Sequence, residues 1–217
     1  MAKPSWAIGV LGGAFDPVHI GHLRGAMAVL DHLGLQRVDL LPAAQSPLKG
    51  SAHLDAVHRL AMLEAAVCDV PGLGIDSREL DRPGPSFTID SLTAIREESE
   101  AGRPIIWIMG SDGLATLPNW SRWEQLLELA HLVVMDRPGA APMPAAVGLW
   151  LERHQASADW LLNHPSGGVL MLQQPLLDIA SSAIRELIAS GKSPRFLLPE
   201  AVMEYIARHD LFAPLAK

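Results

Sequence analysis

Short apolar runs alternate along the chain with segments in which apolar residues recur every three or four positions. The short runs predict strands at 6–11, 37–42, 73–75, 104–109, 131–135 and 169–172. The helical spacing predicts helices from about His22 to Gly34, and at about 54–68, 88–98, 147–162, 181–190 and 199–208. This alternation predicts an α/β fold: a doubly wound, mostly parallel sheet with helices on both faces.

The whole chain, residues 1–217, is expected to form a single domain, because 49% hydrophobic residues are ample for a buried core. The proline-rich start of 140–167 indicates a surface excursion, and residues 178–217 form a small helical C-terminal portion. In open sheets of this kind, ligands bind beyond the carboxyl ends of the strands. Polar residues follow the strands at 15–22, 42–49, 110–112 and 137.

Charge and composition narrow the classes of function. A net charge of −7 without a Lys/Arg cluster argues against a nucleic-acid surface. No apolar run reaches the roughly 18 residues of a membrane span, and Met1–Pro4 lacks the apolar segment of a signal peptide, so the cytoplasm is the expected location. The single cysteine, Cys68, cannot form an internal disulfide, and its neighbours indicate a small core residue.

The segment from Gly12 to His22 is the most informative part of the chain. It reads GGAFDPVHIGH and joins the first predicted strand to the first helix. Glycines let backbone approach a ligand, and the unpaired N–H groups of a helix N-terminus favour an anion. His19 and His22 flank the same position, where imidazole N–H groups can donate to phosphate oxygens. Neither the dinucleotide fingerprint nor a P-loop motif is present.

This segment resembles the opening of the nucleotidyltransferase superfamily with an H/T-x-G-H signature. Within that superfamily, the chain resembles the bacterial nicotinate-nucleotide adenylyltransferase family. The resemblance extends over nearly the full length, through motifs in the family's order at 82–88, 110–112, 119–120, 130–132, 137–139 and 178–185. It implies a Rossmann-like nucleotidyltransferase fold whose C-terminal helical portion, 178–217, completes the ATP site.

The resemblance also implies a reaction. ATP and nicotinate mononucleotide would be the substrates, nicotinate adenine dinucleotide and pyrophosphate the products, and Mg²⁺ would act through the ATP phosphates. Such a transfer needs no protein nucleophile, so positioning and charge neutralisation should dominate catalysis.

The resemblance assigns three residues to catalysis: His19, His22 and Arg185. It assigns ATP binding to Gly12, Gly13, Phe15, Gly21, Asp112, Ile179, Ser181 and Ser182. A helix N-cap is an alternative role for Asp112 and for one of the two serines. Ala180 replaces the first serine of the family's usual pattern, so one contact of the family is missing here.

Acceptor binding is assigned to Lys49, Phe87, Thr88, Trp120 and Arg137. Phe87 stands where the family usually has tyrosine, so ring packing is kept and a hydroxyl contact is lost. A solvated loop lysine and a core tryptophan are alternative interpretations of Lys49 and Trp120. Leu48 replaces a histidine that often precedes the lysine.

Other functions remain open at this point. The histidine motif does not distinguish nicotinate mononucleotide from nicotinamide mononucleotide or pantetheine phosphate as acceptor. A module that only binds a nucleotide would not need His19, His22 and Arg185 together. A purely structural protein would leave these residues unexplained, and the sequence does not decide whether the chain forms a homo-oligomer.

Overall fold

A computed structural model describes the chain except for residues 1–5, 46–51, 136–142, 174–176, 178 and 214–217. Six strands form one fully parallel sheet in the order β3-β2-β1-β4-β5-β6. The strands are β1 (Ile8–Gly13), β2 (Val38–Pro42), β3 (Leu73–Ile75), β4 (Ile105–Gly110), β5 (His131–Met135) and β6 (Val169–Leu172). The strand order reverses at β1, between β2 and β4, which confirms the predicted doubly wound α/β fold.

The strands are buried on both faces, so alternate residues enter two different hydrophobic cores. Ile106 and Ile108 of β4 pack into one core, while Trp107 and Met109 pack into the other. This is the period of two expected for a strand, and burial on both sides explains why the strands read as continuous apolar runs.

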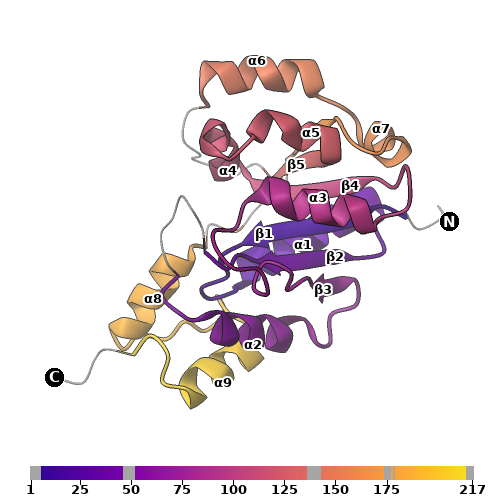
Figure 1. Cartoon of the computed structure of the whole chain (residues 1–217). Helices are drawn as coiled ribbons and strands as arrows, with labels where there is room; N and C mark the ends of the chain where they lie inside the picture. The colour runs from indigo at the N-terminus through magenta and orange to yellow at the C-terminus, as the bar shows by residue number, and fades with distance from the viewer. Residues whose placement is uncertain (1–5, 46–51, 136–142, 174–176, 178, 214–217) are drawn as a thin grey trace.

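Helices cover both faces of the sheet (Figure 1). The first core is closed by α1 (Ile20–Leu33), α2 (Ala56–Val67), α7 (Ala158–Asn163), α8 (Ser181–Ala189) and α9 (Glu200–Arg208). The second is closed by α3 (Thr88–Glu98), α4 (Ser111–Ala115), α5 (Leu126–Leu129) and α6 (Ala145–His154), with short 3₁₀ turns η1 (Leu117–Asn119) and η2 (Trp123–Gln125). No helix within the described ranges is long and apolar enough to cross a membrane.

Two sequence predictions need correction, and one group of short elements was not predicted. The expected helix at 147–162 is two helices, α6 and α7, separated by residues 155–157. The segment between β4 and β5 contains α4, α5 and two 3₁₀ turns that were too short to give a periodic pattern. Cys68 is exposed rather than part of the core, because it caps α2 beyond the buried face that ends at Val67.

His131, at the start of β5, predicts a pH dependence of stability. Its ring is fully buried; Nδ1 accepts from the N–H of Gly168 at 3.0 Å, and Nε2 lies 2.8 Å from the carbonyl oxygen of His164. The bond at Nδ1 places the ring proton on Nε2, so the fold holds neutral imidazole. Burial accordingly lowers the pKa of His131 below its ordinary value of about 6.5.

A depressed pKa means that the unfolded chain binds this proton at a higher pH than the folded chain. The contribution of His131 to the free energy of unfolding is therefore complete above about pH 6.5, and it is lost as the pH falls toward the pKa of the folded state. Urea unfolding of the parent and of His131→Gln between pH 7.5 and 5 measures how the free energy of unfolding of each protein changes with pH. We expect the parent to lose more stability on acidification, by at most about 1.4 kcal/mol per pH unit for one proton. Parallel curves for the two proteins would contradict the prediction.

Candidate active site at the carboxyl ends of β1 and β4

The turn after β1 brings backbone and aromatic rings into close contact. A Cβ on Gly12 would lie 2.5 Å from the buried indole of Trp107, and one on Gly13 would lie 3.0 Å from the ring of Phe15. Phe15 is buried and has a φ of 48°, a left-handed conformation that is uncommon for a phenylalanine. The glycines are thus required by packing in this turn, independently of any ligand.

His19 and His22 start helix α1 by capping each other. Nδ1 of His19 accepts from the backbone N–H of His22, and Nδ1 of His22 accepts from the N–H of His19, both at 3.3 Å. The rings stack with centroids 3.6 Å apart, and Phe15 meets His22 edge-on at 5.0 Å. Because each Nδ1 accepts a backbone proton, each neutral ring carries its own proton on Nε2. Gly21 leaves room for this arrangement, since its Cβ would lie 3.0 Å from Nδ1 of His19.

The expected row of unpaired N–H groups at the start of α1 is largely used within the fold. The N–H of Ile20 donates to the carbonyl oxygen of Leu197 at 2.9 Å, and that of His22 is held by His19. The helix terminus therefore has fewer backbone N–H groups available to an anion than the sequence suggested.

Helix α8 returns to this turn from the far end of the chain. Nη1 of Arg185 donates to the carbonyl oxygen of Asp16 at 2.6 Å, and the hydroxyl of Ser181 donates to the carbonyl oxygen of Pro17 at 3.0 Å. Ile179 is buried, and its Cβ lies 3.5 Å from the point that a Cβ on Gly21 would occupy. The structure thus places Arg185, Ser181 and Ile179 beside the turn that carries the two histidines.

Ala180 and Ser182 also lie at the start of α8, and within the described residues neither side chain bonds to this turn. Ser182 is exposed in the first turn of the helix, and its place as an ATP ligand stays a prediction. Ala180 occupies the N-cap, where a serine would accept a backbone N–H, and the helix has no side-chain cap.

Asp112 and Trp120 lie beyond the end of β4. Asp112 is exposed in the first turn of α4, whose N-cap is Gly110, so the alternative role of Asp112 as a helix cap is wrong. Trp120 is half-buried against the second core; its Nε1 donates to Thr116 at 3.4 Å, and its ring lies near Gly113 of α4. The two side chains therefore belong to one short segment at the carboxyl edge of the sheet.

The connection between β3 and α3 holds the expected acceptor residues. Phe87 is the N-cap of α3 and packs partly on the second core, and Thr88 is its first residue. Ser86 is bonded to the segment after β2: its Oγ accepts from the N–H of Ala44, and its N–H donates to the carbonyl oxygen of Gln45, both at 2.9 Å.

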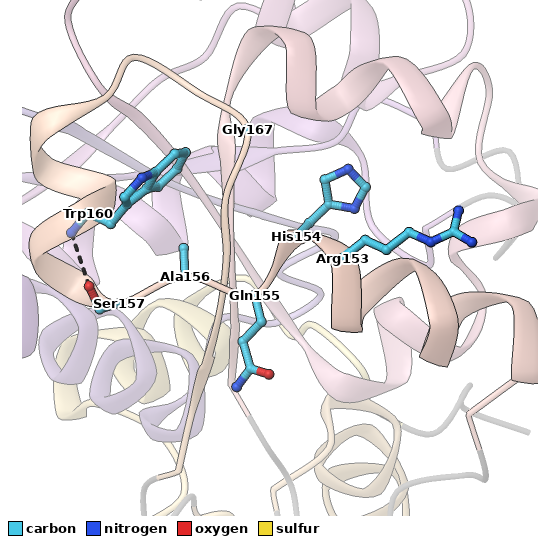
Figure 2. A pocket seen from close by; sticks show the side chains of 7 residues that line it. All are labelled: Arg153, His154, Gln155, Ala156, Ser157, Trp160 and Gly167. Atoms are coloured by element: carbon cyan, nitrogen blue, oxygen red, sulfur yellow. Dashed lines mark hydrogen bonds between the residues drawn. The ribbon is translucent and has the colours of Figure 1, made fainter.

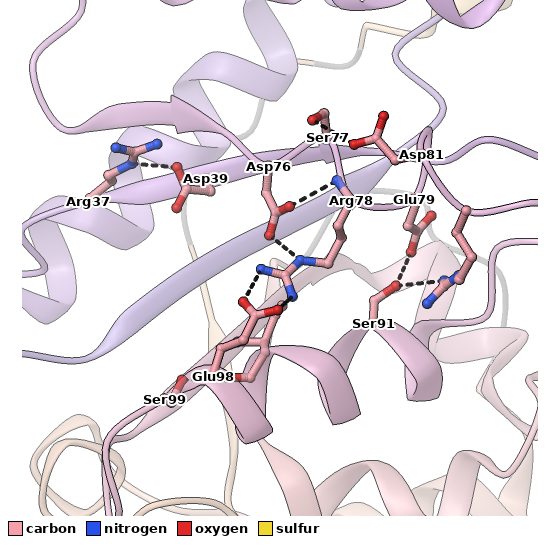
Figure 3. A network of polar contacts seen from close by, with 12 residues as sticks. Arg37, Asp39, Asp76, Ser77, Arg78, Glu79, Asp81, Ser91, Glu98 and Ser99 are labelled. Atoms are coloured by element: carbon pink, nitrogen blue, oxygen red, sulfur yellow. Dashed lines mark hydrogen bonds and ion pairs between the residues drawn. The ribbon is translucent and has the colours of Figure 1, made fainter.

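A polar network stabilises this connection (Figure 3). Arg78 donates to Asp76 at 2.6 Å and to both oxygens of Glu98 on α3 at 3.0 and 3.2 Å. The hydroxyl of Ser91 donates to buried Glu79 at 2.5 Å. These bonds join both ends of α3 to the connection and so hold Phe87 and Thr88, at the start of the helix, in place. The remaining two expected acceptor residues, Lys49 and Arg137, lie outside the described residues.

Two charged residues at this turn were not assigned from the sequence. Asp16 is buried, and its Oδ2 accepts from the N–H of His53 at 2.6 Å and lies 4.0 Å from Nη1 of Arg185. Arg59 of α2 is 1% exposed and donates to the carbonyl oxygen of Ala14, in this turn, and to that of Ala43, just after β2. Its sequence signal was its position: Arg59 lies on the same helical stripe as Met62, Leu63 and Val67, where an apolar residue is expected.

Figure 2 shows a pocket whose lining includes no residue of this turn. It has a volume of about 350 Å³ and is lined by residues 153–157, Trp160 and Gly167. Ala156 bonds to Val169 at the start of β6, and Gly167 bonds to Ala130 just before β5. The pocket therefore lies at the amino ends of the strands, opposite the edge where ligands bind in such sheets.

Known proteins match this chain over most of its length. The family model described as cytidylyltransferase-like matches residues 10–187. A probable nicotinate-nucleotide adenylyltransferase of Pseudomonas fluorescens is 43% identical over 94% of this chain and 96% of its own, and one of Aeromonas hydrophila is 44% identical over 99% and 100%. A solved structure of Plasmodium falciparum nicotinic acid mononucleotide adenylyltransferase complexed with NaAD has a TM-score of 0.73 at 16% identity and covers 95% of this chain and 97% of its own.

The fold, with an imidazole pair in the turn after β1 and a guanidinium bonded to the same turn, is that of a cytidylyltransferase-like nucleotidyltransferase. Within that class, the two bacterial relatives named above are more than 40% identical to this chain over nearly its whole length. The chain belongs to the nicotinate-nucleotide adenylyltransferase family.

Proposed function

We propose that this chain transfers the adenylyl group of ATP to nicotinate mononucleotide, forming nicotinate adenine dinucleotide as a step of NAD biosynthesis. A phosphate oxygen of the mononucleotide attacks the α-phosphorus of ATP, the bond from that phosphorus to the β-phosphate oxygen breaks, and pyrophosphate leaves. Family membership supports the reaction. The observation that carries the site is the bond from Arg185 to Asp16, 169 residues away in sequence, in the turn that holds His19 and His22.

The geometry suits charge neutralisation rather than covalent catalysis. With each Nδ1 accepting a backbone proton, each stacked imidazole carries its proton on Nε2, the atom that we assign as donor to a phosphate oxygen. Arg185 supplies a permanent positive charge from a second element of the fold. Donors in fixed positions stabilise the charge that moves onto the departing pyrophosphate, because they need no reorganisation during the reaction.

The other assigned residues have the following expected roles. Gly12, Gly13, Phe15 and Gly21 shape the turn, Ile179, Ser181 and Ser182 belong to the start of α8, and Asp112 would bind the ribose or adenine of ATP. Phe87, Thr88 and Trp120 would contact the pyridine nucleotide, together with Lys49 and Arg137.

Mg²⁺ would enter with ATP. Within the described ranges, no three His, Cys, Asp or Glu side chains gather as a metal site. At the β1–α1 turn, the imidazoles and the guanidinium suit phosphate oxygens, while the Asp16 carboxylate accepts from the N–H of His53 and lies 4.0 Å from Nη1 of Arg185. We expect the ion to be held by phosphate oxygens and water, where it offsets triphosphate charge. A cytoplasmic location and any self-association stay predictions.

Pyrophosphate release with ATP and each of three acceptors tests the proposal. We expect kcat/KM for nicotinate mononucleotide to exceed that for nicotinamide mononucleotide and pantetheine phosphate by about tenfold or more, since a site that pairs a carboxylate rejects analogues that lack it. The dinucleotide product is identified by mass. Equal or faster turnover with either alternative acceptor would overturn the substrate, and absence of transfer to all three would overturn the activity.

A further inference from the structure

Arg59 of α2 has the largest fully buried side chain of the described residues, and its guanidinium donates to backbone carbonyls. Nε donates to Leu54 at 3.2 Å, Nη1 donates to Ala14 at 2.8 Å and to Ala43 at 2.7 Å, and Nη2 donates to Ala44 at 3.4 Å. Burial lowers the pKa of this guanidinium, although nearby carboxylates partly oppose the effect. A methionine or leucine would fill the same space without burying a charge, so packing alone does not explain an arginine here.

The carbonyls that Arg59 binds belong to segments on opposite sides of the proposed reaction. Ala14 lies in the turn after β1, between Gly13 and Phe15. Ala43 and Ala44 follow β2, and the N–H of Ala44 donates to Ser86, which directly precedes Phe87. One side chain therefore connects the turn of the two histidines to the segment that begins the acceptor side.

Other bonds reinforce the same connection. The N–H of Ala43 donates to Gly13 at 2.9 Å, extending the pairing of β1 and β2 beyond its last ladder bond. Asp16 accepts from the N–H of His53 at 2.6 Å, which ties the far side of the segment after β2 to the β1–α1 turn. Arg59 bonds to the segment after β2 near both of these hydrogen bonds, because Nη1 donates to Ala43 and Nε donates to Leu54, which follows His53.

We infer that Arg59 is a positioning residue for adenylyl transfer, and that its planar guanidinium sets the spacing between the ATP side and the acceptor side. The inference rests on the proposed function. When two bound substrates react without a protein nucleophile, their relative placement carries much of the rate, and an error of about 1 Å can cost about 10²-fold. Lysine keeps the charge but has a single nitrogen, so it cannot reach the same set of carbonyls in one plane.

The chain offers a matched control at the other end of the sheet. Arg96 of α3 also donates to backbone carbonyls: to Leu129 at 2.6 and 3.1 Å, to Arg103 at 2.6 Å and to Pro165 at 2.8 Å. These carbonyls precede β5, β4 and β6, at the amino ends of the strands. Arg96 thus joins segments as Arg59 does, but away from the proposed site.

The test compares Arg59→Lys with Arg96→Lys. For each variant, kcat and KM are measured for both substrates, the Kd of ATP is measured alone by calorimetry, and the melting temperature is recorded. We expect Arg59→Lys to lower kcat by about 10- to 100-fold with the Kd of ATP within about threefold of the parent. Arg96→Lys should lower the melting temperature less, because Arg96 is only partly buried, and should keep kcat within about twofold.

Two results would overturn the inference: kcat of Arg59→Lys within about twofold of the parent, or an equal loss in Arg96→Lys. If Arg59→Lys does not fold, Ser86→Ala decides, because it breaks the next contact of the same connection. Its kcat should fall by about threefold or more, and an unchanged kcat would refute the inference. A parent protein that shows no transfer would instead refute the proposed function, so the two failures are distinguishable.

Discussion

Replacing His22 by alanine should lower kcat/KM for adenylyl transfer by about 10²- to 10³-fold, the usual cost of removing one fixed donor to developing charge. The capping bond to the N–H of His19 leaves the proton of the His22 ring on Nε2, which is the atom expected to donate to phosphate. The measurement is steady-state pyrophosphate release with both substrates varied. A parental rate in the variant would remove His22 from catalysis.

The alanine variant alone is ambiguous, because His22 also helps to start α1. Losing a cap of this kind costs about 0.5–2 kcal/mol of stability. Glutamine is the matched control: at the third helical position its side-chain oxygen can accept from the N–H of His19, as in an ordinary capping box. We expect His22→Gln to recover the melting temperature but not the rate. Recovery of both would mean that His22 acts only as a cap.

Much of the fold could be predicted because its signals are local. Strands buried on both faces appear as short apolar runs, and the helix stripes appear at three- and four-residue spacing, so the alternation and the parallel sheet followed directly. The segment between β4 and β5 was missed because α4 and α5 span five and four residues, less than two helical turns. Such elements are set by packing on the second core rather than by a periodic pattern.

The sequence predicted several of the residues that the fold brings to the turn after β1, but not their geometry there. The GGAFDPVHIGH segment pointed to the turn after β1, but the mutual capping of His19 and His22 depends on backbone directions that no spacing reveals. The pairing of the Ile20 N–H with Leu197 joins residues far apart in sequence and could not be foreseen. Arg59 and Asp16 were missed for the same reason, since their partners lie on other loops.

Replacing Arg185 by methionine should raise the KM for ATP and lower kcat/KM by about 10²-fold or more. Methionine keeps most of the side-chain volume and removes the charge that neutralises phosphate, and hydrogen bonds to charged groups are about twice as strong as neutral ones. The KM for nicotinate mononucleotide should change less, because Arg185 comes from α8, and the described acceptor-side residues come from α3 and the segment after β4.

A competing explanation is that Arg185 only ties α8 to the turn after β1 through its 2.6 Å bond to the carbonyl oxygen of Asp16. Lysine separates the two roles. Its ammonium can still donate to that carbonyl, but it lacks the planar fork that binds phosphate through two parallel bonds. If Arg185 binds the triphosphate, Arg185→Lys recovers the melting temperature and keeps a raised KM for ATP. If Arg185 only joins α8 to the turn after β1, the melting temperature and the KM for ATP recover together, and Arg185 is not a catalytic residue.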